Sequence, residues 1–319
     1  MKKQNLTVKD AGIAFVMAFV TSQITSIIGL VVAQLILQAC GMTGTQIESF
    51  FDTAPGFLLQ AIFMDIGFVL VFLWYFKRMH NKRELFVKPN SKAYKYLAIC
   101  ITIGVGSLFL LSGVTNYFQL LVDKLGFKSA TLGYELNSPS SYIISLISLA
   151  LIPAVCEELI FRGIIVNGLK SNGSTFAIIL SSVMFSIFHF SPSQLIYPFC
   201  FGLILSILYL RTHNIIFPII LHFINNALGL SIQYFSTSSG EFVHSASMLI
   251  YAIITLIIWV CIIIWLFKDF KHNEPKSQNE NLEINTSSED ATALMNAKKD
   301  MWFLNGAIVL MLCLYILLL

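Results

Sequence analysis

Long apolar runs alternate with short polar ones along most of the 319-residue chain. A helix that crosses a bilayer needs about 20 mostly apolar residues. By that measure the sequence predicts an all-α fold, a polytopic transmembrane helix bundle of about eight or nine spans. The predicted spans are 11–38, 55–76, 96–122, 142–167, 174–190, 194–210, 215–235, 245–267 and, at borderline length, 302–319.

Composition agrees with a membrane protein. Hydrophobic residues make up 56% of the chain and charged residues only 12%, about half the charged share of soluble domains. The six cysteines lie in or beside apolar segments without CxxC spacing, so we expect small buried side chains rather than disulfides or a zinc cage. The net charge of +3 is small and says little about nucleic acid. We expect membrane lipid as the surrounding and no nucleic-acid partner.

Basic residues gather in a few of the predicted loops. Seven lysines and arginines lie within 77–95, and Lys170, Arg211 and Lys268 mark three further loops. Cytoplasmic loops carry an excess of Lys and Arg. All four loops fall on one side of the predicted bundle, so we expect a multi-pass cell-membrane protein with a cytoplasmic N-terminus. The short loops and compact size favour a bacterial inner membrane.

The pattern divides the chain into five regions. The segment 268–300 is polar and of mixed charge, which is typical of a flexible segment, and we expect it to be cytoplasmic. The predicted regions are a three-span N-terminal region (1–141), a core (142–235), an eighth span (236–267), the polar segment (268–300) and a C-terminal apolar segment (301–319).

Two adjacent glutamates, Glu157 and Glu158, interrupt the fourth apolar run, followed by Arg162. A carboxylate in hydrocarbon is costly and marks a functional candidate. The two glutamates differ by about 100° around a helix, whereas Glu158 and Arg162 are neighbours on one face. We therefore expect Glu158 to pair with Arg162 and Glu157 to face a cavity. A helix that ends at 167–168 places Glu157 roughly 15 Å from its cytoplasmic end, and a kink is expected at Pro153.

Three further polar residues are predicted at similar depth on other helices: His189, His222 and Asn226. Each alone has a structural explanation, as a packed core histidine or a hydrogen bond between helices. Together with Glu157 they form a set suited to hydrolysis. A carboxylate can act as general base, an imidazole can orient water or bind a metal, and His and Asn can donate to an oxyanion.

The spacing of these residues resembles a known signature. Glu157-Glu158-x-x-x-Arg162, Phe185-x-x-x-His189 and His222-x-x-x-Asn226 are similar to the three motifs of the CPBP family (CAAX proteases and bacteriocin-processing enzymes, formerly Abi), which are intramembrane endopeptidases. The resemblance covers about 142–235. It implies a helical bundle around an intramembrane cavity, in which Glu157 and His189 activate water, His222 and Asn226 stabilise the oxyanion, and Glu158 and Arg162 support them.

The resemblance leaves the need for a metal open. The chain has no HExxH pair, and no cofactor is required by the sequence. Glu157, His189 and His222 are candidate ligands for Zn²⁺ with an open fourth position. The implied substrate is a membrane-associated protein or peptide, and processing of bacteriocins or pheromones, or self-immunity, follows by analogy.

Two other functions compete with proteolysis. The bundle could be a non-catalytic scaffold for a membrane protein partner, or a transporter whose path is lined by Glu157, Asp65 and the histidines. An intact motif argues against the scaffold, and the lack of internal repeats argues against the transporter. For Asp65, which lies outside the motifs, a structural hydrogen bond is the favoured interpretation.

Overall fold

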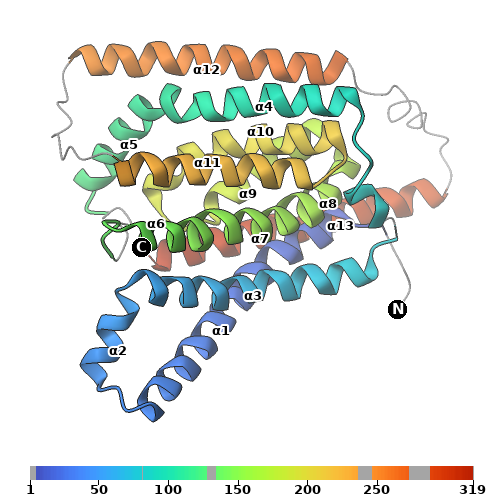
Figure 1. Ribbon diagram of the computed structural model, residues 1–319. Coiled ribbons are helices and arrows are strands. Elements are labelled where there is room, and N and C mark those ends of the chain that lie inside the picture. The colour runs from blue at the N-terminus through green and yellow to red at the C-terminus, as the bar shows by residue number, and fades with distance from the viewer. Residues whose placement is uncertain (1–4, 81, 128–133, 236–245, 273–287, 319) are drawn as a thin grey trace.

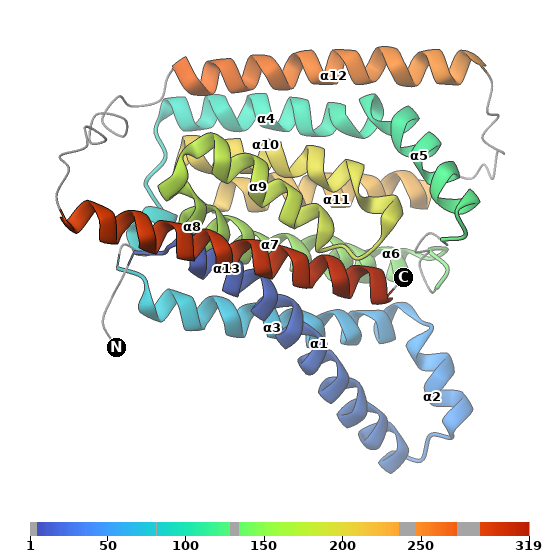
Figure 2. The ribbon, with the colours of Figure 1, turned by 180° about the vertical axis from the view of Figure 1, so that it is seen from behind.

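The computed structural model describes residues 5–80, 82–127, 134–235, 246–272 and 288–318. Long helices lie side by side in a bundle, and α1 crosses them obliquely and projects from one side (Figures 1 and 2). No strand forms in the described residues, although an isolated antiparallel bridge joins Phe86 to Asn214. The predicted all-α helical bundle is confirmed.

The helices in chain order begin and end as follows, with η denoting 3₁₀ or π turns. They are α1 (Val8–Ala39), α2 (Gly44–Phe51), α3 (Ala54–Arg78), η1 (Lys82–Leu85), α4 (Ser91–Leu110), α5 (Ser112–Lys124), α6 (Pro139–Ser145), η2 (Leu146–Leu151), α7 (Ile152–Ile160), η3 (Phe161–Val166), α8 (Asn167–Leu169), η4 (Lys170–Asn172), α9 (Ser174–Ile187), η5 (Pro192–Gln194), α10 (Ile196–Thr212), α11 (Ile216–Phe235), α12 (Ala246–His272) and α13 (Ser288–Leu318).

Fewer helices qualify as membrane spans than the eight or nine predicted. Among the described residues, six helical segments are long and apolar enough to cross a membrane. The predicted span 174–190 is not one of them. Its helix, α9, has 14 residues and reaches only about 21 Å. The six segments are Val8–Ala39, Ala54–Arg78, Ser91–Leu110, Pro139–Asn172, Pro192–Thr212 and Ile216–Phe235.

The predicted span 96–122 is divided into α4 and α5. The hydroxyl of Ser112 donates to the carbonyl of Phe109 (2.7 Å), and that of Thr115 to the carbonyl of Leu111 (3.0 Å). Hydroxyls bonded to backbone carbonyls bend helices, and Ser112 is followed by Gly113. A continuous apolar pattern therefore hides a break made by local hydrogen bonds.

The helical segment from Pro139 to Asn172 carries the glutamates and is longer than predicted. Its start is capped by Ser138, whose side chain accepts from the backbone N–H of Ser141 (3.1 Å). It passes the expected end at 167 and stops before Gly173, whose φ of +102° favours glycine. Glu157 consequently lies near the middle of the segment, deeper than the sequence placed it.

The C-terminal region differs from expectation in one respect. Residues 288–300 belong to α13, whereas the sequence predicted a flexible polar segment throughout 268–300, of which 273–287 lie outside the described residues. Helix α13 packs against α1, where a Cβ added to Gly12 would lie 3.1 Å from the Cα of Leu304. This contact lies in the apolar part of α13, which continues the helix begun in the polar residues.

The cysteines divide into two groups. All six are free, and Cys100, Cys156 and Cys200 are buried as predicted. The prediction is wrong for the other three, because Cys40, Cys261 and Cys313 are exposed on the surface of the bundle.

The predicted basic loops gather at one end of the bundle, which is the right-hand end in Figure 1. The backbone N–H of Val87 donates to the carbonyl of His213 (3.0 Å), which ties the 77–95 loop to the turn after α10. The hydroxyl of Tyr75 donates to the carbonyl of Asp10 (3.1 Å), which ties the end of α3 to the start of α1. The N-terminal end of α1 therefore lies at the same end as these loops.

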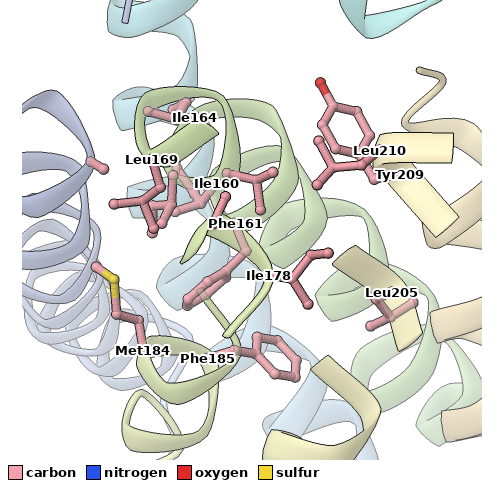
Figure 3. Close-up of a cluster of buried hydrophobic side chains, with 14 of the residues drawn as sticks. Ile160, Phe161, Ile164, Leu169, Ile178, Met184, Phe185, Leu205, Tyr209 and Leu210 are labelled. Carbon is pink, nitrogen blue, oxygen red and sulfur yellow. The ribbon is translucent and has the colours of Figure 1, made fainter. Parts of the chain in front are cut away.

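A tightly packed hydrophobic cluster supports the polar residues (Figure 3). Phe161 and Phe185 meet edge to face, with ring centroids 5.0 Å apart at 87°, a favourable geometry for aromatic pairs. Ile164, Ile178 and Leu205 are fully buried around them. This cluster joins η3, α9 and α10 and fixes the backbone from which the candidate site projects.

Candidate active site

Glu158 is the centre of a chain of three buried polar side chains. Its Oε1 accepts from Nη1 of Arg162 (2.7 Å) and from Nδ1 of His222 (2.9 Å). Both Glu158 and Arg162 are fully buried, and His222 is 4% exposed. Nη2 of Arg162 donates to the carbonyl of Gly202 (3.1 Å). The expected Glu158–Arg162 pair is present, but Glu158 also holds a histidine from α11.

The bond to Glu158 orients the ring of His222. A carboxylate oxygen only accepts, so Nδ1 of His222 carries the hydrogen. Nε2 then points away from Glu158, and it lies 4.0 Å from Oε2 of Glu157. Glu158 and Arg162 thus set both the tautomer and the direction of the imidazole that faces Glu157.

Glu157 occupies a different environment from its neighbour. Its side chain is 18% exposed, whereas Glu158 is inaccessible. No protein group bonds its Oε2 atom, which is itself buried. The sequence separated the two glutamates by the helical angle alone. The structure pairs Glu158 as expected and leaves Glu157 partly exposed, and the cavity beside Glu157 stays a prediction.

His189 belongs to the same region but stands apart from the glutamates. It lies in the turn that follows α9, and its Nδ1 bonds the carbonyl of Phe185 (2.8 Å). A carbonyl only accepts, so Nε2 is again the free nitrogen. The Phe185 ring meets the imidazoles of His189 and His222 edge to face, with centroids 5.0 and 5.8 Å away. Phe185 therefore spaces the two histidines.

Aromatic packing fixes the turn that carries His189. Phe188, one residue earlier, packs against Phe15 and Phe68 with centroids 5.9 and 5.3 Å away. Phe190 follows with φ of +47°, a conformation uncommon for a bulky residue, and it stacks on Phe19 at 4.3 Å. Contacts with α1 and α3 thus hold the residues on both sides of the histidine.

Two π-helical turns, η2 and η3, flank the glutamates in sequence. Such turns often occur at functional sites because they leave backbone groups free to bond elsewhere. Nδ2 of Asn226 donates to the carbonyl of Leu149 in η2 (3.3 Å). Nδ2 of Asn167 donates to the carbonyls of Arg162 and Gly163 in η3 (3.0 and 3.1 Å). Pro153, where the sequence predicted a kink, is the second residue of α7, which follows η2.

Sequence reasoning missed several supporting groups. The hydroxyl of Tyr197 donates to Oδ1 of Asn225 (2.6 Å), which joins α10 to α11 beside His222. The Gly202 carbonyl and Phe185 both contact Arg162, whose guanidinium lies 4.9 Å from the Phe185 ring centroid. The spacing of Phe185 to His189 was visible in the sequence. No sequence pattern predicted the contact of Tyr197 or those of the Gly202 and Phe185 carbonyls.

The structure does not assemble the metal site that the sequence left open. Across the described residues, which include Glu157, His189 and His222, no group of three His, Cys, Asp or Glu side chains is arranged to hold a metal ion. His222 instead binds Glu158, and no ion pair joins His189 to Glu157 within this part of the chain. The side chains present therefore do not fit a bound Zn²⁺, and no step below depends on one.

This arrangement combines an unbonded carboxylate with two oriented imidazoles in the middle of a membrane helix bundle. Residues 139–228 match the family model described as type II CAAX prenyl endopeptidase Rce1-like. The match covers nearly the same range as the core expected from the sequence and includes all seven motif residues. No curated protein and no solved structure matches the chain.

Proposed function

We propose that the chain hydrolyses a peptide bond within the membrane, because residues 139–228 match the family model of Rce1-like type II CAAX prenyl endopeptidases, which are peptide hydrolases. The observation that carries the residue assignment is the pair of distances at His222. Its Nδ1 is 2.9 Å from Glu158 and its Nε2 is 4.0 Å from Glu157. A water molecule bonded to both Nε2 and Glu157 fits that separation.

In the proposed reaction, Glu157 is the general base. It takes a proton from the attacking water as the water oxygen bonds to the carbonyl carbon of the substrate. It then returns the proton to the amine nitrogen as the carbon–nitrogen bond breaks. His189 assists by orienting the water through its free Nε2, since Nδ1 is held by the Phe185 carbonyl.

His222 and Asn226 are the proposed oxyanion donors. For this role Nε2 of His222 takes a second hydrogen from solvent water while Nδ1 remains bonded to Glu158, and Nε2 then donates to the developing oxygen charge. The buried Glu158 carboxylate stabilises that cation, and Arg162 balances the carboxylate. Asn226 has a second amide hydrogen besides the one directed at the Leu149 carbonyl.

The substrate class is also a proposal. The chain is a multi-pass membrane protein with its candidate base near the middle of a long helical segment. A membrane-associated protein or peptide fits that depth, and CAAX prenyl substrates are suggested by the name of the matching family. Bacteriocin or pheromone processing and self-immunity are narrower forms of this proposal. A bacterial inner-membrane location is proposed as well.

The test compares Glu157→Gln with the parent protein, each purified in detergent. Substrates are fluorogenic peptides with a lipidated C-terminus and a library of membrane peptides. We expect kcat to fall at least about 100-fold, as for loss of a general base. Glu48→Gln, an exposed carboxylate on α2, is the matched control and should keep full activity. Equal cleavage by Glu157→Gln and the parent would show that Glu157 is not the general base.

A chelator arm addresses the metal separately. We expect cleavage to survive dialysis against a strong chelator, because the side chains are not arranged as a metal site. Loss of cleavage on chelation and recovery on adding back Zn²⁺ would contradict this expectation. The Glu157→Gln variant would then still test, by itself, whether Glu157 is needed.

A further inference from the structure

Asp65 is a buried carboxylate that the proposed reaction does not yet use. It lies in the middle of α3, only 6% exposed, within a helix long and apolar enough to cross the membrane. A carboxylate at such a place is costly unless it is bonded or has a function. Within the described residues no protein group donates a hydrogen bond to it, so the structural hydrogen bond favoured from the sequence is not found.

The packing of α3 against α7 brings Asp65 to the site. The two helices run in the same direction side by side (Figures 1 and 2). Phe72 of α3 lies against Gly163, where an added Cβ would be 3.3 Å from its ring. Moving back by seven residues on each parallel helix brings Asp65 to about the level of Cys156, since only residues 161–163 of that interval belong to η3.

The register also places Asp65 about one residue from Glu157 along α7, because Cys156 directly precedes Glu157 in the sequence. Glu157 has His222 on one side, at 4.0 Å, and its Oε2 atom is buried without a hydrogen-bond partner. Two carboxyl groups that accept no hydrogen bond from the described residues thus lie at about the same level of the packed helices α3 and α7. Other ionisable groups also lie around Asp65 and Glu157. They are Cys156, Glu158 and Arg162 on the same helical segment as Glu157, and His222 on α11.

Two neighbouring carboxylates of this kind cannot both be ionised at low cost, and one hydrogen held between them removes the repulsion. We propose that Asp65 is a positioning residue of the active site, which holds the Glu157 carboxylate toward His222 through a hydrogen that the two carboxyl groups share, directly or through one water. The proposal rests on the assignment of Glu157 as base. It adds a residue from α3, outside the motif region, to the three helices already named.

The activity test uses two substitutions of different chemistry. Asp65→Asn keeps a hydrogen-bond donor toward Glu157, whereas Asp65→Leu is of similar size and keeps none. We expect kcat to fall about tenfold in the first and about 100-fold in the second, since small misplacement of a reacting group costs that much. KM should stay within about twofold, because Asp65 does not touch the substrate. Gln60→Leu, a polar-to-apolar change on the same helix, is the control.

Infrared difference spectroscopy of the purified protein supplies a readout that needs no substrate. A protonated carboxyl band is expected in the parent, and it should disappear in both Asp65→Asn and Glu157→Gln. A band that persists in both variants, or unchanged kcat in both Asp65 variants, would overturn the role of Asp65. If Glu157→Gln kept full activity, Glu157 would not be the general base. The infrared result would still decide whether Asp65 and Glu157 share a hydrogen.

Discussion

Arg162 contacts three different parts of the candidate site, so we expect its replacement to disturb all three. Its guanidinium is fully buried and contacts Glu158, the Gly202 carbonyl and the Phe185 ring. Removing one partner of a buried ion pair leaves an uncompensated charge, which costs roughly 3–5 kcal/mol, whereas removing both partners is often nearly neutral. The pair is therefore expected to matter more for holding His222 than for net stability.

We predict that Arg162→Met lowers the thermal unfolding temperature in detergent far more than the double variant Glu158→Gln/Arg162→Met. The double variant should regain most of the stability but not the peptidase activity, because His222 then loses the carboxylate that orients it. Tryptophan fluorescence on heating measures the first quantity and peptide cleavage the second. Equal destabilisation by the single and double variants would contradict the account of Arg162.

Residue-level reasoning from the sequence succeeded where a helix alone determines the geometry. Glu158 and Arg162 are four residues apart, and that spacing is enough to make them neighbours. The contact between Glu158 and His222 was not predicted, because it joins residues 64 positions apart. The sequence treated Glu158 as a partner of Arg162 alone, whereas the structure makes it the link between that pair and the imidazole facing Glu157.

At the scale of the helices, close approach depends on small residues. A Cβ on Gly67 of α3 would lie 2.5 Å from the backbone nitrogen and Cα of Ser22 in α1. Thr21 adds a hydrogen bond from its hydroxyl to the carbonyl of Gly67 (3.3 Å). Small residues at such crossings allow membrane helices to pack by van der Waals contact. Asp65 lies two residues from this crossing, so the position of α3 also sets the position of Asp65.

We predict that Gly67→Ala destabilises the protein by about 1–3 kcal/mol, the usual cost of forcing an extra carbon into a packed contact. Gly106 in α4 is the matched control. A Cβ there meets nothing within 4 Å, so Gly106→Ala should leave stability unchanged or raise it by about 1 kcal/mol through helix propensity. Thermal unfolding in detergent compares the two. A Gly67→Ala variant as stable as Gly106→Ala would show that α1 and α3 are not in close contact.

The hydrophobic pattern located most helices but not their interruptions. An apolar run reports that a segment avoids water, and that property is shared by α-helical, 3₁₀ and π turns. The π turns η2 and η3 and the short α9 therefore left no sign in the pattern. They depend on side chains such as Asn226 and Asn167, which donate to carbonyls of η2 and η3, and on the packing of Phe188 against the distant helix α1.

At the scale of the molecule, the two ends of the bundle differ in chemistry. At one end, Lys9, Arg78 and Lys82 each lie over an aromatic ring, at 4.5, 4.0 and 4.6 Å from the centroids of Phe303, Trp74 and Phe76. Such pairs are typical of the membrane–water interface, where long basic side chains reach the headgroups and aromatic rings lie beneath. The opposite end carries Cys40 and α2, with Glu48 and Asp52.

This difference leads to a prediction of sidedness. If the basic end is cytoplasmic, Cys40 should react from outside intact cells with a charged maleimide that does not cross membranes. Lys88→Cys in a Cys40→Ser background should react only after the membrane is opened, because Lys88 is exposed in the basic loop. Cys261 and Cys313 are exposed as well, so both are changed to Ser in every labelled variant. Labelling of Lys88→Cys from outside would show that the basic end faces the outside, which is the opposite of the expected orientation. Glu157, near the middle of its helical segment, would then receive substrate from the other leaflet.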